Sequence, residues 1–420
     1  MASNLDNARA WEARLERASA YALYLHVPFC AQKCAYCDFA SWATRRGDPL
    51  MSAYADALAS QVRELEGLGV LEGLHTAYIG GGTPSLLGAP TLGGLVACAS
   101  ALGPEELSCE ANPDSLGNDV IEVLLSNEAT RVSIGVQSLV DTELVELGRL
   151  HDSALAQERV RAAVGSGLDV SCDLMCATPG QTDASWQETL EAAIALGVSH
   201  MSVYPLMIEE GTAFDRRYSN DGCAWNSDEV QACRMKKAQV ELERHGFNQY
   251  EVASYAKAGK TCKHNIAYWT AQPYFGLGTK ASSMLTLNLY LKLCDACRSL
   301  PAPPSEASRA RLTVKNSRSE IARDPQLASL RFDIEFLTEA QAAAEDLMLG
   351  ARMRAGLDPG LVAHARRLLP SLDECLDGLV TDGYLTARAG RLAPTERGWL
   401  LGNELYERLW DLAPGDVLEL

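Results

Sequence analysis

Three cysteines within eight residues are the strongest chemical signal in this chain. Cys30, Cys34 and Cys37 follow an apolar, strand-like run at residues 24–29 in a Cys-x3-Cys-x2-Cys arrangement. Thiolates are the soft ligands that iron–sulfur clusters and zinc select. A structural zinc site and a cubane cluster each have four positions to fill, and this loop supplies three. One iron of a [4Fe-4S] cluster would then remain open to a small molecule.

Two other interpretations of the cysteines remain open at this point. Cysteine is often buried as a small hydrophobic residue, although three in so short a stretch make that reading weak. His26 on the preceding strand could complete a zinc site if its side chain turned into the loop. The residues favour a site-differentiated [4Fe-4S] cluster over both.

The cysteine arrangement, with Tyr36 directly before the last cysteine, resembles the radical S-adenosylmethionine (SAM) superfamily. The Tyr-x-His-x-Pro-Phe-Cys run that starts at Tyr24 and the pair Asp38-Phe39 resemble one branch of it. That branch contains the oxygen-independent coproporphyrinogen III oxidases and their relatives, the HemW-type haem chaperones. The resemblance implies that SAM chelates the open iron through its amino and carboxylate groups. Electron transfer from the reduced cluster then breaks a sulfonium C–S bond and gives a 5′-deoxyadenosyl radical.

Strand-like and helix-like segments alternate about six times over residues 22–208, which favours parallel βαβ units. Glycine and polar residues cluster after the expected strand ends, where α/β barrels place their sites. The resemblance implies an α/β fold built as a partial (β/α)6 TIM-type barrel. After the first strand, further strands are expected near residues 75–79, 107–111, 131–136, 169–175 and 201–206.

A SAM pocket is implied at the ends of these strands. Taken singly, each residue there is better explained as part of a tight turn, a satisfied polar group or a surface charge, and only their order along the chain, which matches the family, assigns them a ligand. Carboxylates would bind ribose hydroxyls or the ammonium group, and an arginine would bind a carboxylate in bidentate fashion. The residues implied are Tyr24, Tyr36, Gly81, Gly82, Thr83, Glu110, Gln137, Arg149 and Asp173.

A second motif, His-Asn-x-x-Tyr-Trp at residues 264–269, places a metal-capable imidazole beside two large aromatic side chains. Haem iron is commonly held by histidine, and an aromatic wall suits a porphyrin. From residue types alone, a core histidine hydrogen-bonded among aromatics is the favoured reading. The motif resembles the one that marks the haem chaperone branch, which implies haem binding at His264, Asn265, Tyr268 and Trp269.

Three stretches depart from family patterns. Cys176-Ala177-Thr178-Pro179-Gly180 stands where the family usually has Tyr-Gly-Leu-Pro-Gly, so the pocket wall beside Asp173 is expected to differ. Residues 279–282 replace a usual Gly-Ala-His-Ser. Coproporphyrinogen oxidases typically carry Gly-Cys after the third cysteine, whereas this chain has Asp38-Phe39, which favours the chaperone.

Composition narrows the class of partner and the compartment. The 420 residues carry a formal net charge of -18, which argues against nucleic acid as a partner because counterion release needs clustered Lys and Arg. No apolar run approaches the roughly 20 residues that span a bilayer. The 13 cysteines at scattered spacings are typical of reduced thiols plus a metal site, so we expect a cytoplasmic protein.

Four segments are expected along the chain. They are an N-terminal extension (1–20), a radical SAM core with the haem motif (21–290), a linker (291–335) and a small C-terminal α+β domain (336–412). Residues 301–323 are rich in Pro, Ala, Ser, Arg and Glu, which is typical of a surface connection. The helix–helix–hairpin–helix pattern of the last segment resembles a winged helix, for which a lid or interaction role is expected.

The first functional hypothesis is a haem chaperone that binds a [4Fe-4S] cluster, SAM and haem. It would pass haem to acceptor proteins such as respiratory haem enzymes. The resemblance also implies an electron donor such as a flavodoxin or ferredoxin, and peripheral contact with membrane proteins. The alternative is a radical SAM oxidoreductase, an oxygen-independent coproporphyrinogen III dehydrogenase acting on a porphyrinogen. A nucleic-acid-binding regulator using the winged helix is a third hypothesis, which the acidic charge disfavours.

Overall fold

The computed structural model describes residues 11, 13–14, 16–218, 223–297, 300–413, 415 and 418–419. Of the expected N-terminal extension (1–20), residues 1–10, 12 and 15 lie outside the described residues. Trp11 is buried in the hydrophobic cluster of the C-terminal unit. Within the described residues, no helix combines the length and the apolar character needed to cross a bilayer.

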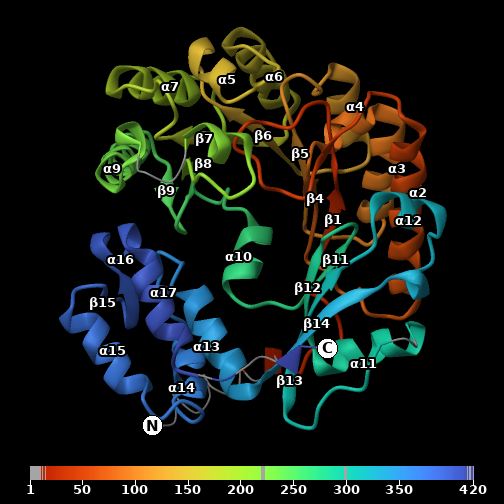
Figure 1. The fold of residues 1–420 in the computed structure, drawn as a ribbon, viewed down its shortest axis with the longest axis vertical. Coiled ribbons are helices and arrows are strands. Elements are labelled where there is room, and N and C mark those ends of the chain that lie inside the picture. Colours follow the sequence, from red (N-terminus) through yellow and green to blue (C-terminus); the bar gives the residue numbers. More distant parts are fainter. Residues whose placement is uncertain are drawn as a thin grey trace.

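Six parallel strands in chain order form the wall of a partial barrel, with helices on its outer side (Figure 1). The strands are β1 (Ala22–Val27), β4 (Thr76–Gly81), β5 (Glu106–Ala111), β6 (Arg131–Gln137), β7 (Asp169–Cys176) and β8 (His200–Pro205). The connecting helices are α2 (Pro49–Gly67), α3 (Ala89–Ser100), α4 (Asn118–Ser126), α6 (Ser153–Ser166) and α7 (Asp183–Ala195). The predicted (β/α)6 arrangement is confirmed. A short helix, α5 (Asp141–Glu146), was not predicted.

The two faces of the barrel strands differ in polarity. On β7, Val170, Cys172 and Leu174 belong to the main hydrophobic cluster, while Ser171 and Asp173 line an internal cavity. The same alternation runs along β6 and β8, because successive side chains on a strand point to opposite faces. Branched apolar residues usually fill an α/β barrel. Here the inward positions are largely polar, and a cavity remains.

The sheet continues beyond the six strands at both edges. Beside β8 lie β10 (Ser254–Ala256) and β9 (Asn248–Gln249), and beside β1 lies β11 (Tyr274–Leu277), followed outward by β12 (Ser282–Thr286), β13 (Ala307–Val314), β14 (Phe332–Thr338) and β17 (Leu418–Glu419). A small separate pair is formed by β2 (Phe29–Cys30) and β3 (Trp42–Ala43). The other helices before the C-terminal unit are α8 (Ala213–Tyr218), α9 (Asp228–Arg244), α10 (Lys263–Trp269), α11 (Leu287–Ala296) and α12 (Arg318–Arg323).

The expectation of a linker at 291–335 is wrong. This segment contains β13, which pairs with β12 on one side and with β14 on the other. Ala310, Leu312 and Val314 are buried at every second position, and this period builds a central strand. The prolines and small residues at 301–306 obscured that short pattern in the sequence.

The C-terminal unit has a hydrophobic cluster of its own. It comprises α13 (Glu339–Gly350), α14 (Pro359–Ala365), α15 (Leu372–Thr381), the hairpin β15 (Leu385–Arg388) and β16 (Arg391–Pro394), α16 (Glu396–Leu400) and α17 (Gly402–Trp410). The winged-helix-like order is confirmed, with two differences. The helix α14 was not predicted, and the expected last helix is divided at Leu401. Buried ion pairs from Arg309 on β13 to Glu345 and Asp346 on α13 tie this unit to the sheet.

Candidate functional site

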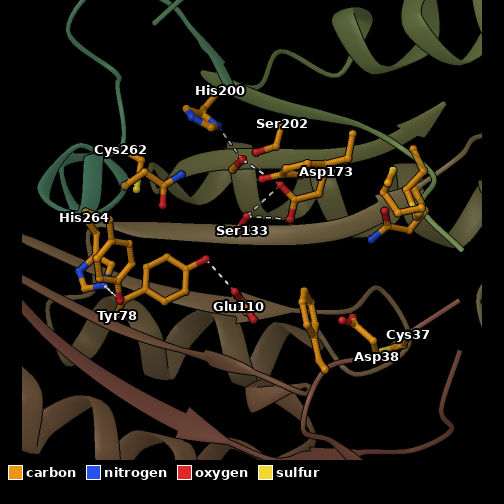
Figure 2. A pocket seen from close by; sticks show the side chains of 18 of the residues that line it. Cys37, Asp38, Tyr78, Glu110, Ser133, Asp173, His200, Ser202, Cys262 and His264 are labelled. Carbon is orange, nitrogen blue, oxygen red and sulfur yellow. Dashed lines mark hydrogen bonds between the residues drawn. The ribbon is translucent and has the colours of Figure 1, made fainter. Parts of the chain in front are cut away.

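An internal cavity of about 600 Å³ lies within the barrel (Figure 2). Its wall combines residues of the barrel strands with the cysteine loop and α10. The predicted site residues that line it are Tyr24, Tyr36, Cys37, Glu110, Gln137, Asp173, His264, Asn265 and Tyr268. The structure therefore brings one end of the cysteine motif, part of the implied SAM pocket and most of the haem motif to one space.

The three cysteines of the motif are free thiols, each beside a polar side chain. Thr83 Oγ1 donates to Cys30 Sγ (3.5 Å), and Arg149 Nη1 donates to Cys34 Sγ (3.3 Å). Burial raises the pKa of Cys30 and of Cys37. Among the described residues, no group of three His, Cys, Asp or Glu side chains is arranged so that it could hold a single metal ion. Thiolates that bind three different irons of one cluster need not converge on a point, so the donor set suits a cluster better than zinc.

His26 is engaged elsewhere and does not act as a fourth ligand in this structure. Its Nδ1 is hydrogen-bonded to the Tyr24 hydroxyl, and its Nε2 to the carbonyl oxygen of Ala40, both at 2.9 Å. The glycine run packs against the same region. A Cβ atom on Gly81 would lie 2.4 Å from the His26 ring, and one on Gly82 would lie 2.8 Å from the Phe29 carbonyl oxygen. These glycines are thus needed to seat β4 against the start of the cysteine loop.

Asn112 is a residue that the sequence reasoning missed, although it lies only two positions after Glu110. Its Nδ2 donates to Thr83 Oγ1 (3.0 Å), and its Oδ1 accepts from Arg149 Nη2 (2.7 Å). Because Thr83 contacts Cys30 and Arg149 contacts Cys34, Asn112 connects the partners of two cysteines. A buried polar network of this kind fixes side-chain positions.

Two carboxyl groups face the cavity in a largely desolvated setting (Figure 2). Glu110 accepts from the Tyr78 hydroxyl and from the Gly81 backbone N–H, both at 2.9 Å, yet burial raises its pKa to about 7. Asp173 accepts from Ser133 Oγ at 3.0 and 3.2 Å, and burial raises its pKa as well. A cationic ligand between them would favour both ionised forms, which suits an ammonium or sulfonium group.

Gln137 is held in an uncommon backbone conformation at the carboxyl end of β6. Its φ is 69°, and the pairing of β6 with β7 shifts register between Gly135 and Gln137. A non-glycine residue in the left-handed region is a form of stored strain that is common at functional sites. The irregularity lies where Gln137 lines the cavity.

His264 is buried and uses both ring nitrogens. Nδ1 is hydrogen-bonded to Thr76 Oγ1 and Nε2 to the Tyr268 hydroxyl, both at 2.9 Å, and the ring stacks on Tyr78. Burial lowers the pKa of His264 to about 3, so the imidazole is neutral. This is the arrangement of the core histidine that the residue types favoured. It is also that of a metal-ligating histidine, whose second nitrogen is normally oriented by a hydrogen bond.

Trp269, the last residue of the predicted haem motif, does not line the cavity. The guanidinium group of Arg352, from the C-terminal unit, lies 5.2 Å from the centre of its ring. Because α10 turns once every 3.6 residues, Trp269 cannot share the face of His264 and Tyr268. The prediction that all four motif residues share one site is therefore wrong for Trp269 in this structure.

Several residues that line the cavity were not predicted from the sequence, because they lie in the amino-terminal halves of the strands. The sites of α/β barrels lie at the carboxyl ends of the strands, where the prediction looked for them. Their signal was the polar residue at every second position of otherwise apolar strands. They are Tyr78, Arg131, Ser133, Ser171, His200 and Ser202.

Two of the family departures coincide with left-handed backbone. Ala177 has a φ of 55° and Lys280 a φ of 62°. Glycine adopts this conformation freely, whereas other residues are strained in it. At Ala177 this explains the glycine of the usual Tyr-Gly-Leu-Pro-Gly pattern.

Comparison with known families and proteins gives consistent results. The model of the Radical SAM superfamily matches residues 24–193, and that of the HemN C-terminal domain matches residues 337–401. The haem chaperone HemW of Mycobacterium tuberculosis is 31% identical over 395 residues, covering 93% of this chain and 94% of the relative. The HemW of Escherichia coli is 31% identical over 393 residues, covering 92% and 97%.

Among solved structures, the coproporphyrinogen III oxidase HemN of Escherichia coli has the same fold. The TM-score is 0.72 at 18% identity, and the match covers 95% of this chain and 92% of that protein.

Proposed function

This chain belongs to the HemW haem chaperone family of the radical SAM superfamily, and from that membership we propose that it binds a [4Fe-4S] cluster, SAM and haem and passes haem to acceptor proteins. The observation that carries the proposal is the shared cavity, whose wall contains both Cys37 and His264. Respiratory haem enzymes are the proposed acceptors, and a flavodoxin or ferredoxin is the proposed electron donor.

Cys30, Cys34 and Cys37 would hold the cluster, which supplies one open iron and a reducing electron when it is bound. Arg149 holds Cys34 in place by donating a hydrogen bond from Nη1 to its sulfur atom. Thr83 holds Cys30 in place by its hydrogen bond. The chain's own task at this end of the cavity is to orient the three sulfur atoms.

SAM would occupy the space between the cysteine loop and the two buried carboxyl groups. Glu110 and Asp173 are suited to its hydroxyl and ammonium groups, since both accept hydrogen bonds and both gain from a nearby positive charge. Gln137, held at the strand end, offers an amide to the same space. Tyr24 and Tyr36 flank the ligand with aromatic surface.

Haem would bind at the other end of the cavity through His264. In the tautomer that donates from Nδ1 to Thr76, Nε2 is free of hydrogen and accepts from Tyr268. Iron would take the place of that hydroxyl, so Tyr268 must turn aside when haem binds. The neutral state of the ring at physiological pH keeps the lone pair available.

The test is a haem titration of the anaerobically reconstituted protein, followed at the Soret band, with His264→Ala and His151→Ala beside the wild type. His151 is a matched control, because it is buried and hydrogen-bonded to Val136 but does not line the cavity. Saturable binding that is weakened only in His264→Ala supports the proposal. Binding equal in all three proteins would refute the ligand role.

The alternative function, a radical SAM enzyme, predicts a different result with the same reconstituted protein. An oxygen-independent coproporphyrinogen III dehydrogenase would cleave SAM and form protoporphyrinogen under anaerobic conditions. Product formation without saturable haem binding would replace the chaperone proposal by this one.

A further inference from the structure

Arg131 has unused hydrogen-bonding capacity in the wall of the cavity. It is the first residue of β6, only 3% exposed, and it lines the cavity. Nη2 donates to the carbonyl oxygens of Lys260 (2.8 Å) and Thr261 (3.2 Å). Nη1 and Nε are both buried, and neither has a hydrogen-bond partner among the described residues. Buried donors are nearly always satisfied, so an unpaired Nη1 on a side chain that lines a cavity points to a ligand that supplies the acceptor.

The charge of Arg131 is only partly balanced by protein groups. In the part of the chain that the structure describes, its ion-pair partner is Glu106, whose Oε2 lies 3.5 Å from Nε. Glu106 also accepts the backbone N–H groups of Lys263 (3.1 Å) and His264 (3.0 Å). The Glu106 carboxylate therefore interacts both with the guanidinium group of Arg131 and with the backbone N–H groups of the first turn of α10. A second anion at Nη1 would complete the pairing of a buried charge.

The position of Arg131 couples it to the haem motif. Thr261, which accepts from Nη2, lies just before α10, and Glu106 contacts both Arg131 and His264. Thr76, the partner of His264, is the first residue of β4, as Arg131 is of β6. Arg131 and His264 thus share the end of the barrel formed by the amino ends of the strands.

This end of the cavity combines polar side chains with aromatic rings. Ser133 and Ser171 are paired with one another across β6 and β7, and both line the cavity. The rings of Tyr78 and Tyr268 also line it, and both pack against His264. A ligand with an aromatic body and an acidic edge matches this lining.

We propose that Arg131 anchors a carboxylate at the amino end of the barrel, and that this carboxylate is a propionate group of haem. The assignment rests on the proposed haem-binding function. A guanidinium group binds a carboxylate through charge-assisted hydrogen bonds, and its planar shape fixes the orientation of the ligand. Arg131 would then set how the porphyrin lies relative to His264, while Nη2 holds the segment that precedes α10.

The test compares haem with haem dimethyl ester, which keeps the macrocycle and iron but has no carboxylate. Affinities of the anaerobically reconstituted full chain are measured by Soret titration for the wild type, Arg131→Gln and Arg234→Gln. Arg234 is a matched control, because it is a buried arginine bonded to Gln181 that does not line the cavity. We expect the wild type to prefer haem by about tenfold or more, as a hydrogen bond to a charged group implies. The ratio of the affinity for haem to the affinity for its dimethyl ester should approach one in Arg131→Gln and stay at the wild-type value in Arg234→Gln.

The outcomes separate this assignment from the function on which it rests. Equal wild-type affinity for haem and its ester would overturn the carboxylate anchor alone, and so would a preference that survives in Arg131→Gln. Absence of saturable binding for both ligands would overturn the haem proposal together with the anchor. If Arg131→Gln fails to fold, Arg131→Lys takes its place, because it keeps the buried positive charge but loses the planar guanidinium group; an undiminished preference for haem over its ester in Arg131→Lys would overturn the anchor.

Discussion

The protonation state of His264 gives a sharp test of the buried site. Burial lowers the pKa of this ring to about 3, against an unperturbed value of about 6.5. At pH 5 a ring with a pKa of 3 is about 1% protonated, whereas a solvated histidine is about 97% protonated. Lowering the pH from 8 to 5 should therefore leave His264 neutral.

Histidine-labelled protein followed by NMR measures this directly. The signals of His264 are assigned by their loss in His264→Gln, and their shifts are recorded between pH 8 and pH 5. Tyr268→Phe serves as a matched control, because it removes the Nε2 partner without adding or removing a group that titrates in this range. We expect the His264 shifts to stay constant in both the wild type and Tyr268→Phe. A titration with a midpoint near 6.5 would show that the ring is solvated and refute the reasoning.

The same shift has a consequence for stability. Because the folded-state pKa of His264 lies below the unfolded value, the folded state binds fewer protons than the unfolded state as the pH falls. The contribution of this side chain to stability is thus complete above about pH 6.5 and is progressively lost as the pH falls toward 3. A haem ligand of this kind keeps its affinity in mildly acidic solution, where an exposed histidine would lose it to protonation.

Three further predictions concern the other end of the cavity. Gly81→Ala should lower the melting temperature more than Gly180→Ala, because both glycines have positive φ but, of the two, only Gly81 has no room for a Cβ atom. The overpacking should add roughly 1–3 kcal/mol to the loss of folding free energy. Equal melting temperatures for the two variants would contradict this. Cys34→Ala should lose most of the cluster iron in a metal assay, whereas Cys98→Ala, outside the motif, should retain it; equal iron in both would exclude Cys34 as a ligand. SAM affinity, measured by calorimetry, should rise as the pH increases through about 7 as Glu110 ionises, and Glu110→Gln should abolish that rise.

The barrel was predictable from the sequence because its signals are local. Each strand is a short apolar run followed by a turn, and each helix has its own periodic face. The strand expected at 131–136 is β6 (Arg131–Gln137), and the strand expected at 169–175 is β7 (Asp169–Cys176). The segment 291–335 was misjudged because the prolines and small residues at 301–306 suggest a loose connection, whereas β13 is held in place by its pairing with β12 and β14. Strand pairing is a tertiary property that composition does not report.

The site was predictable only where the residues matched a family motif. Glu110 and Asp173 were found in this way, and the structure brings both to the cavity. The position of Trp269 depended on the rotation of α10, which the motif alone does not reveal. Arg131 was missed because its only signal, the polar residue at every second position of β6, does not show that this face of the strand lines a cavity.

The pairing of β1 has a consequence for synthesis on the ribosome. Its neighbours are β4, about 50 residues downstream, and β11, in which Tyr274 pairs with Ala22 across about 250 residues. While the chain is being made, the β11 side of this first strand stays open long after the β4 side is covered. An open strand edge can pair with another nascent chain, and late long-range contacts make folding slow. The barrel edge beside β1, and with it the cavity that α10 helps to line, can therefore close only after β11 has been made.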